Sequence, residues 1–215
     1  HVEDTYEAVY TRITEEDVST LKGLDDFSRV GEYYMLAVEP AKQGYNASYI
    51  YCDEETMYIA RDQMKLLEGR LPQKEDEVAV SRYFLSNYGA DAGIGEKVML
   101  NSESFHGEYT VTGILEGYKE KEVNGSSILL SKEALKGWSG YDPADYRAYV
   151  HFKNEQQMDE TELTARSREI AKEYQLEMPI MNLSYMKFYK QPVNVSMLAL
   201  VAGIAVLVII GGYVV

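Results

Sequence analysis

The middle of the sequence reads Leu66-Leu-Glu-Gly-Arg-Leu-Pro72, Glu77-Val-Ala-Val-Ser81, Gly95-Glu-Lys-Val-Met-Leu100 and Tyr109-Thr-Val-Thr-Gly-Ile-Leu115. Short apolar runs bounded by glycine, proline and acidic residues are typical of strands joined by turns. We therefore predict strands over 77–80, 96–100 and 109–115. The last two are expected to form a hairpin, because the apolar residues of 109–115 alternate with polar ones.

Helix signals surround these strands. Ser81 is a good N-cap for a short helix over 82–88, and Gly89 after it is a natural left-handed terminator. Toward the N-terminus, Thr14-Glu-Glu-Asp17 matches the capping-box pattern and predicts a helix over 15–22. The segment over 6–13 alternates like a strand, although it also fits the end of a membrane helix that lies upstream.

The segment over 30–52 has the pattern of a hairpin. Apolar and aromatic runs over 30–38 and 45–52 predict two strands joined by the turn that begins at Pro40. Asp53 then predicts the start of a helix over 54–67, because Met57, Ala60, Met64 and Leu67 recur at helical spacing.

The C-terminal half continues with alternating element types. We expect strands over 127–130 and 146–152, a short helix after Ser131, and a long amphipathic helix over 159–174. No repeat of fixed period is present. The fold class is therefore α+β, with mixed or antiparallel sheets and short helices. About 190 residues are enough for one sizeable domain or two small lobes.

The last 21 residues form an apolar segment without a charged side chain. As a helix it would be about 31 Å long, close to the roughly 30 Å hydrocarbon core of a bilayer. We predict an extracytoplasmic domain over 1–190 and a truncated transmembrane helix over 191–215. Positions along this helix include Val195, Leu200, Gly203, Val208, Gly212 and Val215. A buried core helix fits less well, because such helices are usually shorter and carry a polar stripe.

Aromatic and basic residues lie just before this apolar segment. Tyrosine rings and lysine tips settle at the headgroup level of a bilayer. We predict that four residues anchor the domain at the interface: Tyr185, Lys187, Tyr189 and Lys190.

The charge and cysteine content exclude some classes of protein. The chain has 35 acidic and 21 basic side chains, a net charge of −14, so nucleic acid is not an expected partner. Cys52 is the single cysteine, which rules out an internal disulfide. It lies in an apolar, strand-like run, and we predict a buried, unreactive side chain.

The sequence contains no recognisable catalytic pattern. It has no phosphate-binding loop and no nucleophile elbow. His1, His106 and His151 have no cysteine or acidic residue at the spacing typical of zinc ligands, so no metal site is predicted. We expect a protein that is not an enzyme, with no catalytic residue and no cofactor.

The order and spacing of the four quoted segments resemble the extracytoplasmic core domain of FtsX-like and MacB-like ABC transporter permeases. The shared pattern is a Gly-Arg-x-Pro turn, a strand that ends in serine, a Gly-Asp-x-Val-x-Leu strand and an aromatic-x-Val-x-Gly-Ile strand. Glu96 stands where the family usually has aspartate. The match covers about 50 residues, and the apolar segment follows where the family has its second membrane helix.

This resemblance implies a function and a set of partners. The domain would lie outside a bacterial cell membrane, between the first and second transmembrane helices of a permease. Its partners would be a cytoplasmic ABC ATPase, a second permease subunit in a dimer, and the lipid bilayer. ATP hydrolysis by that separate subunit would drive export or mechanical signalling. The alternative is a single-pass, membrane-anchored extracellular domain that binds or senses a ligand. The family contributes no catalytic residue in this domain.

Overall fold

A ten-stranded mixed sheet connects both halves of the molecule in the computed structural model. The strand order is β10-β1-β9-β2-β3-β8-β5-β7-β4, and β6 pairs with β7 beside this path. The pairs β3/β8 and β5/β7 are parallel, and the other pairs are antiparallel. The structure describes residues 5–42, 45–60, 64–88, 91–117, 120, 125–153 and 155–189. The predicted α+β class with a mixed sheet is confirmed.

The strands have the following bounds: β1 Ala8–Ile13, β2 Phe27–Lys42, β3 Tyr45–Cys52, β4 Met64–Gly69, β5 Glu77–Ser81, β6 Lys97–Asn101, β7 His106–Gly117, β8 Gly125–Leu130, β9 Tyr146–Phe152 and β10 Ile180–Met181. The helices are α1 Glu15–Lys22, α2 Glu54–Ile59, α3 Arg82–Tyr88, α5 Lys132–Gly137, the one-turn 3₁₀ helix η1 Glu155–Gln157, α6 Glu160–Glu173 and α7 Leu183–Tyr189.

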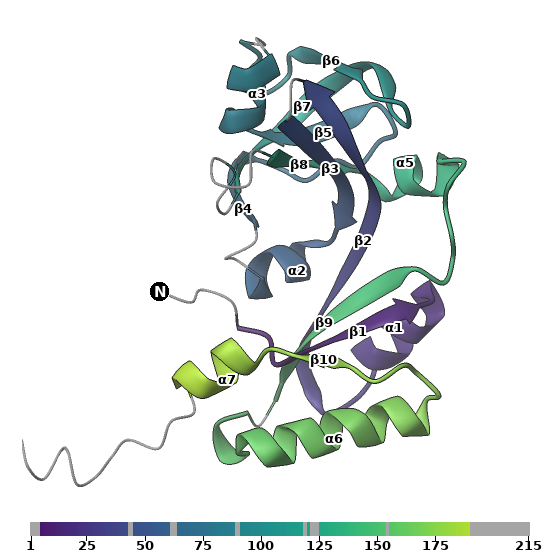
Figure 1. The fold of residues 1–215 in the computed structure, drawn as a ribbon, viewed down its shortest axis with the longest axis vertical. Helices are drawn as coiled ribbons and strands as arrows, with labels where there is room; N and C mark the ends of the chain where they lie inside the picture. The colour runs from purple at the N-terminus through teal and green to yellow at the C-terminus, as the bar shows by residue number, and fades with distance from the viewer. Residues whose placement is uncertain are drawn as a thin grey trace, which may run out of the picture.

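The sheet is divided into two lobes (Figure 1). The lower lobe contains β1, β9, β10, α1, α6 and α7, and the upper lobe contains β3 to β8 with α3 and α5. β2, 16 residues long, belongs to both: its first half pairs with β9 and its second half with β3. The change of partner occurs at Tyr33, which pairs with Arg147 of β9 and Cys52 of β3. One strand therefore connects the two lobes mechanically.

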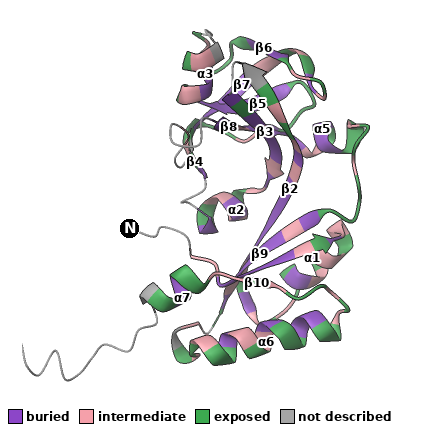
Figure 2. Ribbon diagram, in the orientation of Figure 1, coloured by how far each residue is buried: buried purple, intermediate pink, exposed green. Residues whose placement is uncertain are grey.

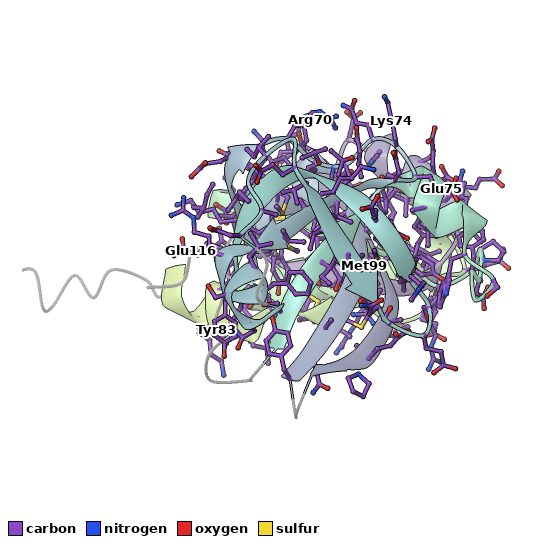
Figure 3. The ribbon with its side chains drawn as sticks, turned by 90° about the horizontal axis from the view of Figure 1, so that it is seen from above. Arg70, Lys74, Glu75, Tyr83, Met99 and Glu116 are labelled. Atoms are coloured by element: carbon purple, nitrogen blue, oxygen red, sulfur yellow. The ribbon has the colours of Figure 1, made fainter. Side chains whose placement is uncertain are left out.

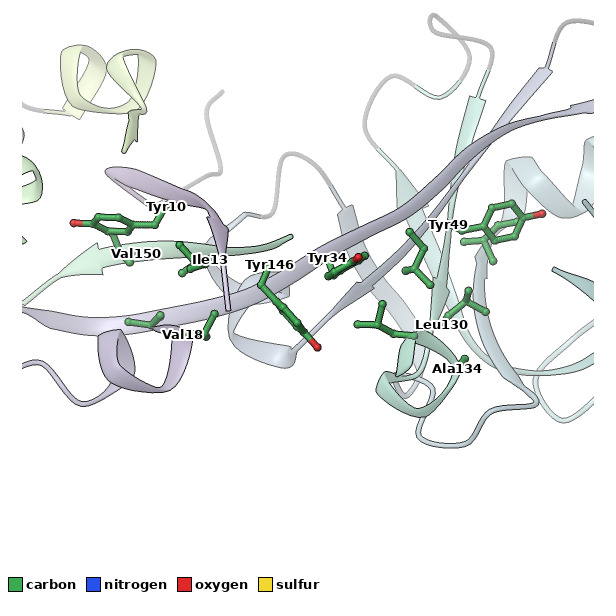
Figure 4. Packing of buried hydrophobic residues seen from close by; sticks show 14 of the residues in the cluster. Tyr10, Ile13, Val18, Tyr34, Tyr49, Leu130, Ala134, Tyr146 and Val150 are labelled. Carbon is green, nitrogen blue, oxygen red and sulfur yellow. The ribbon is translucent and has the colours of Figure 1, made fainter. Parts of the chain in front are cut away.

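Buried side chains follow β2 from one lobe into the other (Figures 2 and 4). In the lower lobe, Tyr10 and Val150 pack beside α6, and the Tyr10 hydroxyl donates a 3.0 Å hydrogen bond to the Ser167 carbonyl oxygen. Tyr34 and Tyr146 continue this core toward Tyr49 in the upper lobe. The continuous core stabilises the arrangement of the lobes as well as each lobe separately.

Strand β1 contains a bulge that the sequence pattern does not show. Arg12 has φ +54°, and the pairing with β9 shifts between Thr11 and Ile13. An extra residue in one strand moves the next side chain to the opposite face. Ile13 therefore packs in the same core cluster as Ala8 and Tyr10, although strict alternation predicts the other face.

The predicted helix over 54–67 is wrong in its second half. Asp53 caps α2 as expected, and its side chain accepts a 2.9 Å hydrogen bond from the Thr56 N–H, but α2 ends at Ile59. Residues Met64–Gly69 form β4 instead, which pairs with β7. The apolar spacing of this segment fits both structures, and pairing with β7 decides between them.

The predicted membrane segment lies outside the residues that the structure describes, and with it Val195, Leu200, Gly203, Val208, Gly212 and Val215. Among the helices of the described part of the chain, none has the length and apolar character needed to span a bilayer.

Candidate functional site at the junction of the chain ends

The residues that carry the sequence pattern form a closed turn in the upper lobe. Arg70 donates two hydrogen bonds, of 2.7 and 2.8 Å, to the two carboxylate oxygens of Glu77. The backbone N–H groups of Gln73 and Lys74 also donate to Glu77, which is 6 % exposed. Hydrogen bonds from Arg70, and then from these N–H groups, lower the pKa of Glu77 to about 2. Figure 3 shows Arg70 and Lys74 at one edge of this lobe.

Two glycines of the same pattern allow the chain to pass close to itself. Gly69 has φ +79°, and a Cβ there would lie 2.2 Å from the Thr112 carbonyl oxygen. A Cβ on Gly113 would lie 2.6 Å from the Arg70 carbonyl oxygen. The Arg70 N–H donates a 2.9 Å hydrogen bond to Thr112 at this crossing. The pattern thus has a structural role: it closes the turn onto β7.

A group of charged side chains connects the two lobes beside β2. Lys132 of α5 lies 2.6 Å from Glu32 of β2 and 2.7 Å from Glu15 of α1. Lys22 of α1 lies 2.9 Å from Asp53 and 3.6 Å from Glu32. Burial lowers the pKa of Lys132, but the hydrogen bonds and charges of the two glutamates raise it by more. We call these five residues the inter-lobe network.

The two ends of the domain are hydrogen-bonded to each other in the lower lobe. The Asn182 N–H donates to the Glu7 carbonyl oxygen at 2.8 Å, and Asn182 Nδ2 donates to the Tyr6 carbonyl oxygen at 3.1 Å. β10 pairs with β1 at Ala8 and Val9. We call this region the junction. It includes the first described residues and the start of α7, the last helix among the residues that the structure describes.

Three ligand-type side chains meet beneath the junction. Glu7 is 0 % exposed, and its Oε1 lies 3.1 Å from His151 Nδ1 while its Oε2 accepts a 2.8 Å hydrogen bond from the Phe152 N–H. Glu155 of η1 lies close by, and its Oε2 accepts a 3.2 Å hydrogen bond from the Tyr185 hydroxyl. One possible metal-ligand atom from each of Glu7, His151 and Glu155 lies within 4.8 Å of the other two.

The electrostatics of this group reflect its burial. Removal from water raises the pKa of Glu7, and the hydrogen bond and charge of His151 offset only part of that effect. Burial lowers the pKa of His151, but the hydrogen bond and charge of Glu7 outweigh it, so the pKa of His151 is raised. Glu7 and His151 are 144 residues apart, so their spacing in the sequence gives no sign of the contact, whereas Glu155 lies four residues after His151 and could have been considered as its partner.

The structure describes the burial of two of the four residues predicted to anchor the domain at the bilayer interface. Tyr185 is 4 % exposed and packs in the core of the lower lobe. Lys187 is exposed near the end of α7. Lys190 lies outside the described residues, and Tyr189 is described only as the last residue of α7. Anchoring at the bilayer therefore remains a prediction. Of the two predicted anchors whose burial the structure describes, Tyr185 is buried and Lys187 is exposed.

Cys52 is 3 % exposed, as predicted for a small apolar side chain, and burial raises the pKa of its thiol.

A hollow of about 490 Å³ lies against α3, where Arg82 pairs with Glu68 at its wall. Leu85, Ile94 and Ile114 are among the other residues that line it.

The chain is similar in fold to several solved structures. One is the extracellular domain of the noncanonic ABC-type transporter YknZ from Gram-positive bacteria, with 16 % identity and a TM-score of 0.55, covering 81 % of this chain and 98 % of that one. The second is the periplasmic region of MacB from Actinobacillus actinomycetemcomitans, with 12 % identity and a TM-score of 0.53, covering 84 % and 89 %. The chain has the fold of a MacB-like periplasmic domain.

The third similar structure is a domain of a protein described as a permease from Porphyromonas gingivalis, with 14 % identity and a TM-score of 0.53, covering 80 % of this chain and 85 % of that one. No protein-family model and no curated protein matches the sequence. The structural neighbours thus support the fold that the family resemblance implied, that of the extracellular or periplasmic domains named in these structures. The likeness to a MacB-like domain concerns the fold, because all three identities are low.

Proposed function

We propose that this chain is the extracytoplasmic domain of an ABC transporter permease and that it works with a separate cytoplasmic ATPase. ATP hydrolysis by that subunit would move the membrane segments, and the domain would convert this movement into export or into a mechanical signal. The fold likeness supports this proposal, because one similar structure is the extracellular domain of an ABC-type transporter and another is the periplasmic region of MacB. The proposal gives the domain no catalytic step of its own.

The single observation that carries the proposal is that the first and last strands of the described domain lie side by side. A domain inserted between two membrane helices needs its first and last residues close together, at one end of the molecule. Here β1 and β10 pair directly, and Asn182 bonds to the backbone of Tyr6 and Glu7 (Figure 1). A displacement of either membrane helix would therefore reach the lower lobe through the junction.

Transmission to the upper lobe follows from two further connections. β2 passes without interruption from the β9 side to the β3 side. The inter-lobe network joins α1 to α5 beside it. In this proposal the lobes respond together, and a second permease subunit supplies the opposing domain. The predicted helix over 191–215 anchors the domain in a bacterial cell membrane.

Co-purification tests the proposal. The native protein that contains this chain is tagged, isolated from membranes in mild detergent and analysed for associated proteins. A stoichiometric P-loop ATPase is the expected result. Its reproducible absence, with the domain folded, contradicts the proposal and favours the single-pass, membrane-anchored binding domain.

Outward placement has its own test. Glu75 is exposed in the upper lobe, whereas Cys52 is buried and serves as the internal control. In Glu75→Cys, a membrane-impermeant maleimide is expected to label intact spheroplasts and to leave the parent protein unlabelled. Labelling that requires lysis contradicts the extracytoplasmic assignment.

A further inference from the structure

The group beneath the junction has the composition of a metal site as well as that of an ion pair. It offers one imidazole nitrogen and two carboxylate groups, from β9, from the residue before β1 and from η1. Imidazole together with carboxylate suits zinc and related divalent transition metals, whereas magnesium favours sites made of oxygen ligands alone. We propose that Glu7, His151 and Glu155 bind a divalent transition-metal ion of the zinc class.

The distances suit such an ion. Bonds of about 2.0–2.2 Å from zinc to nitrogen and oxygen place two ligands of a tetrahedral site about 3.4 Å apart. Glu7 Oε1 and His151 Nδ1 are already 3.1 Å apart. The whole set spans 4.8 Å, so one ligand has to approach. Glu155 is the least constrained, because it is partly exposed and lies in a single 3₁₀ turn.

Each of the three ligands also has a partner that orients it. The Phe152 N–H bonds to the second oxygen of Glu7, and the Tyr185 hydroxyl bonds to Glu155. The imidazole of His151 also bonds to the Thr5 backbone. Metal-binding histidines and carboxylates in proteins are usually held by such outer hydrogen bonds, which fix the ring and raise affinity. A simple surface ion pair does not require this second set of contacts.

The net charge of the three side chains also favours a bound cation. Glu7 is fully buried, and Glu155 adds a second negative charge beside it. His151 supplies at most one positive charge. A buried carboxylate without full compensation is costly, and a divalent cation would neutralise both carboxylates at once.

The ion would also connect the two ends of the domain. Glu7 precedes β1, and Tyr185, which orients Glu155, belongs to α7. Metal binding would therefore stabilise the junction. This inference goes beyond the proposed function and does not depend on it, because the ligand geometry is the same in a transporter and in a single-pass protein.

Calorimetric titration of the chelator-treated, 215-residue chain in detergent with Zn²⁺ tests the proposal. We expect one ion per chain and a rise in the melting temperature with Zn²⁺, because a ligand that binds the folded state stabilises it. Mg²⁺ at the same concentration is expected to produce neither effect. Co²⁺ should give the visible absorption of a nitrogen and oxygen site of low coordination number.

Two variants locate the ion. Glu155→Gln removes a partly exposed ligand with little change in shape, and we expect affinity to fall more than about tenfold, since the loss of an outer hydrogen bond alone costs about 10–100-fold. Tyr185→Phe removes the outer hydrogen bond to Glu155, and its Zn²⁺ affinity should fall by about 10–100-fold. Glu173→Gln, an exposed change on α6, is the matched control and should bind as the parent does. Absence of Zn²⁺ binding in the parent, or equal affinity in the parent and Glu155→Gln, overturns the proposal.

Discussion

The turn at Arg70–Glu77 and the group of Glu7, His151 and Glu155 beneath the junction both contain a buried glutamate, but the two carboxylates are satisfied in different ways. Glu77 accepts from one guanidinium and two backbone N–H groups, all supplied within 7 residues of sequence. Glu7 depends on an imidazole 144 residues away and one backbone N–H. The turn is a locally complete unit, whereas the junction forms only when the two ends of the domain meet. We infer that the turn holds the fold and the junction is where movement or a ligand acts on it.

The largest effect is expected from overfilling the turn. Gly113→Ala would place a methyl group against the Arg70 carbonyl oxygen and the Leu66 side chain, and should destabilise the protein by about 1–3 kcal/mol. Gly137→Ala is the control, because a Cβ there meets one atom at an ordinary 3.6 Å. Denaturant unfolding measures both. Equal stability of the two variants would show that the crossing is not tightly packed.

The second prediction concerns the acid stability that Glu77 provides. Its folded-state pKa of about 2 lies below the ordinary 4.5, so its charge stabilises the fold fully above pH 4.5, and this contribution is lost as the pH falls toward 2. Glu77→Gln should therefore be less stable than the parent at neutral pH, and the difference should shrink between pH 4.5 and 2.

The matched control for this pH profile is Glu108→Gln, because Glu108 pairs with Lys97 on an exposed surface. An exposed pair contributes little, so this variant should follow the parent at every pH. A Glu77→Gln deficit that does not change with pH would mean that the substitution acts through packing and not through charge.

At the junction, Asn182→Ala is expected to have a moderate effect. Asn182 Oδ1 accepts from the Tyr185 N–H at the start of α7, and its Nδ2 donates to the Tyr6 carbonyl oxygen. Loss of a helix cap costs about 0.5–2 kcal/mol. Native-state hydrogen exchange should show faster exchange in α7 and unchanged exchange in β5. Acceleration throughout the protein would contradict the separation of the two regions.

The smallest effect is expected from Tyr10→Phe, which leaves both regions intact. It removes the hydrogen bond from Tyr10 to the Ser167 carbonyl oxygen between β1 and α6, worth about 0.5–1.5 kcal/mol. Thermal unfolding should show this loss, while Zn²⁺ affinity and the exchange of junction amides stay as in the parent. A change in either would mean that α6 helps to position the junction.

Local chemistry explains which elements could be predicted. The helix starts predicted at Thr14, Asp53 and Ser131 are confirmed, because a cap needs only a side chain and an N–H group three residues later. Asp159 also caps a helix, although it was predicted to lie within that helix. The strands beside the turn could also be predicted, because short apolar runs bounded by turn residues are likewise local signals. The error over 54–67 arose because the apolar spacing of its second half fits both a helix and a strand. Pairing with β7, which is distant in sequence, makes that half a strand.

The complete site could not be predicted from local sequence. Nothing near Glu7 in sequence indicates a partner, whereas Glu155, four residues after His151, was within reach of a local search. Strand β10 has two residues, and Asn182 follows it directly. Only the pairing order β10-β1-β9 brings these residues together. A search for buried acidic residues on strands, matched against every histidine, would have included this pair.

The most direct test of the account compares the two regions during the ATPase cycle. Hydrogen exchange is measured on the native permease and ATPase complex with ADP and with a non-hydrolysable ATP analogue. The account predicts that the nucleotide changes exchange at the junction amides, such as Asn182 and Glu7, and leaves the turn amides of Gln73 and Lys74 unchanged. Identical junction exchange in both nucleotide states, or a change confined to the turn, would contradict it.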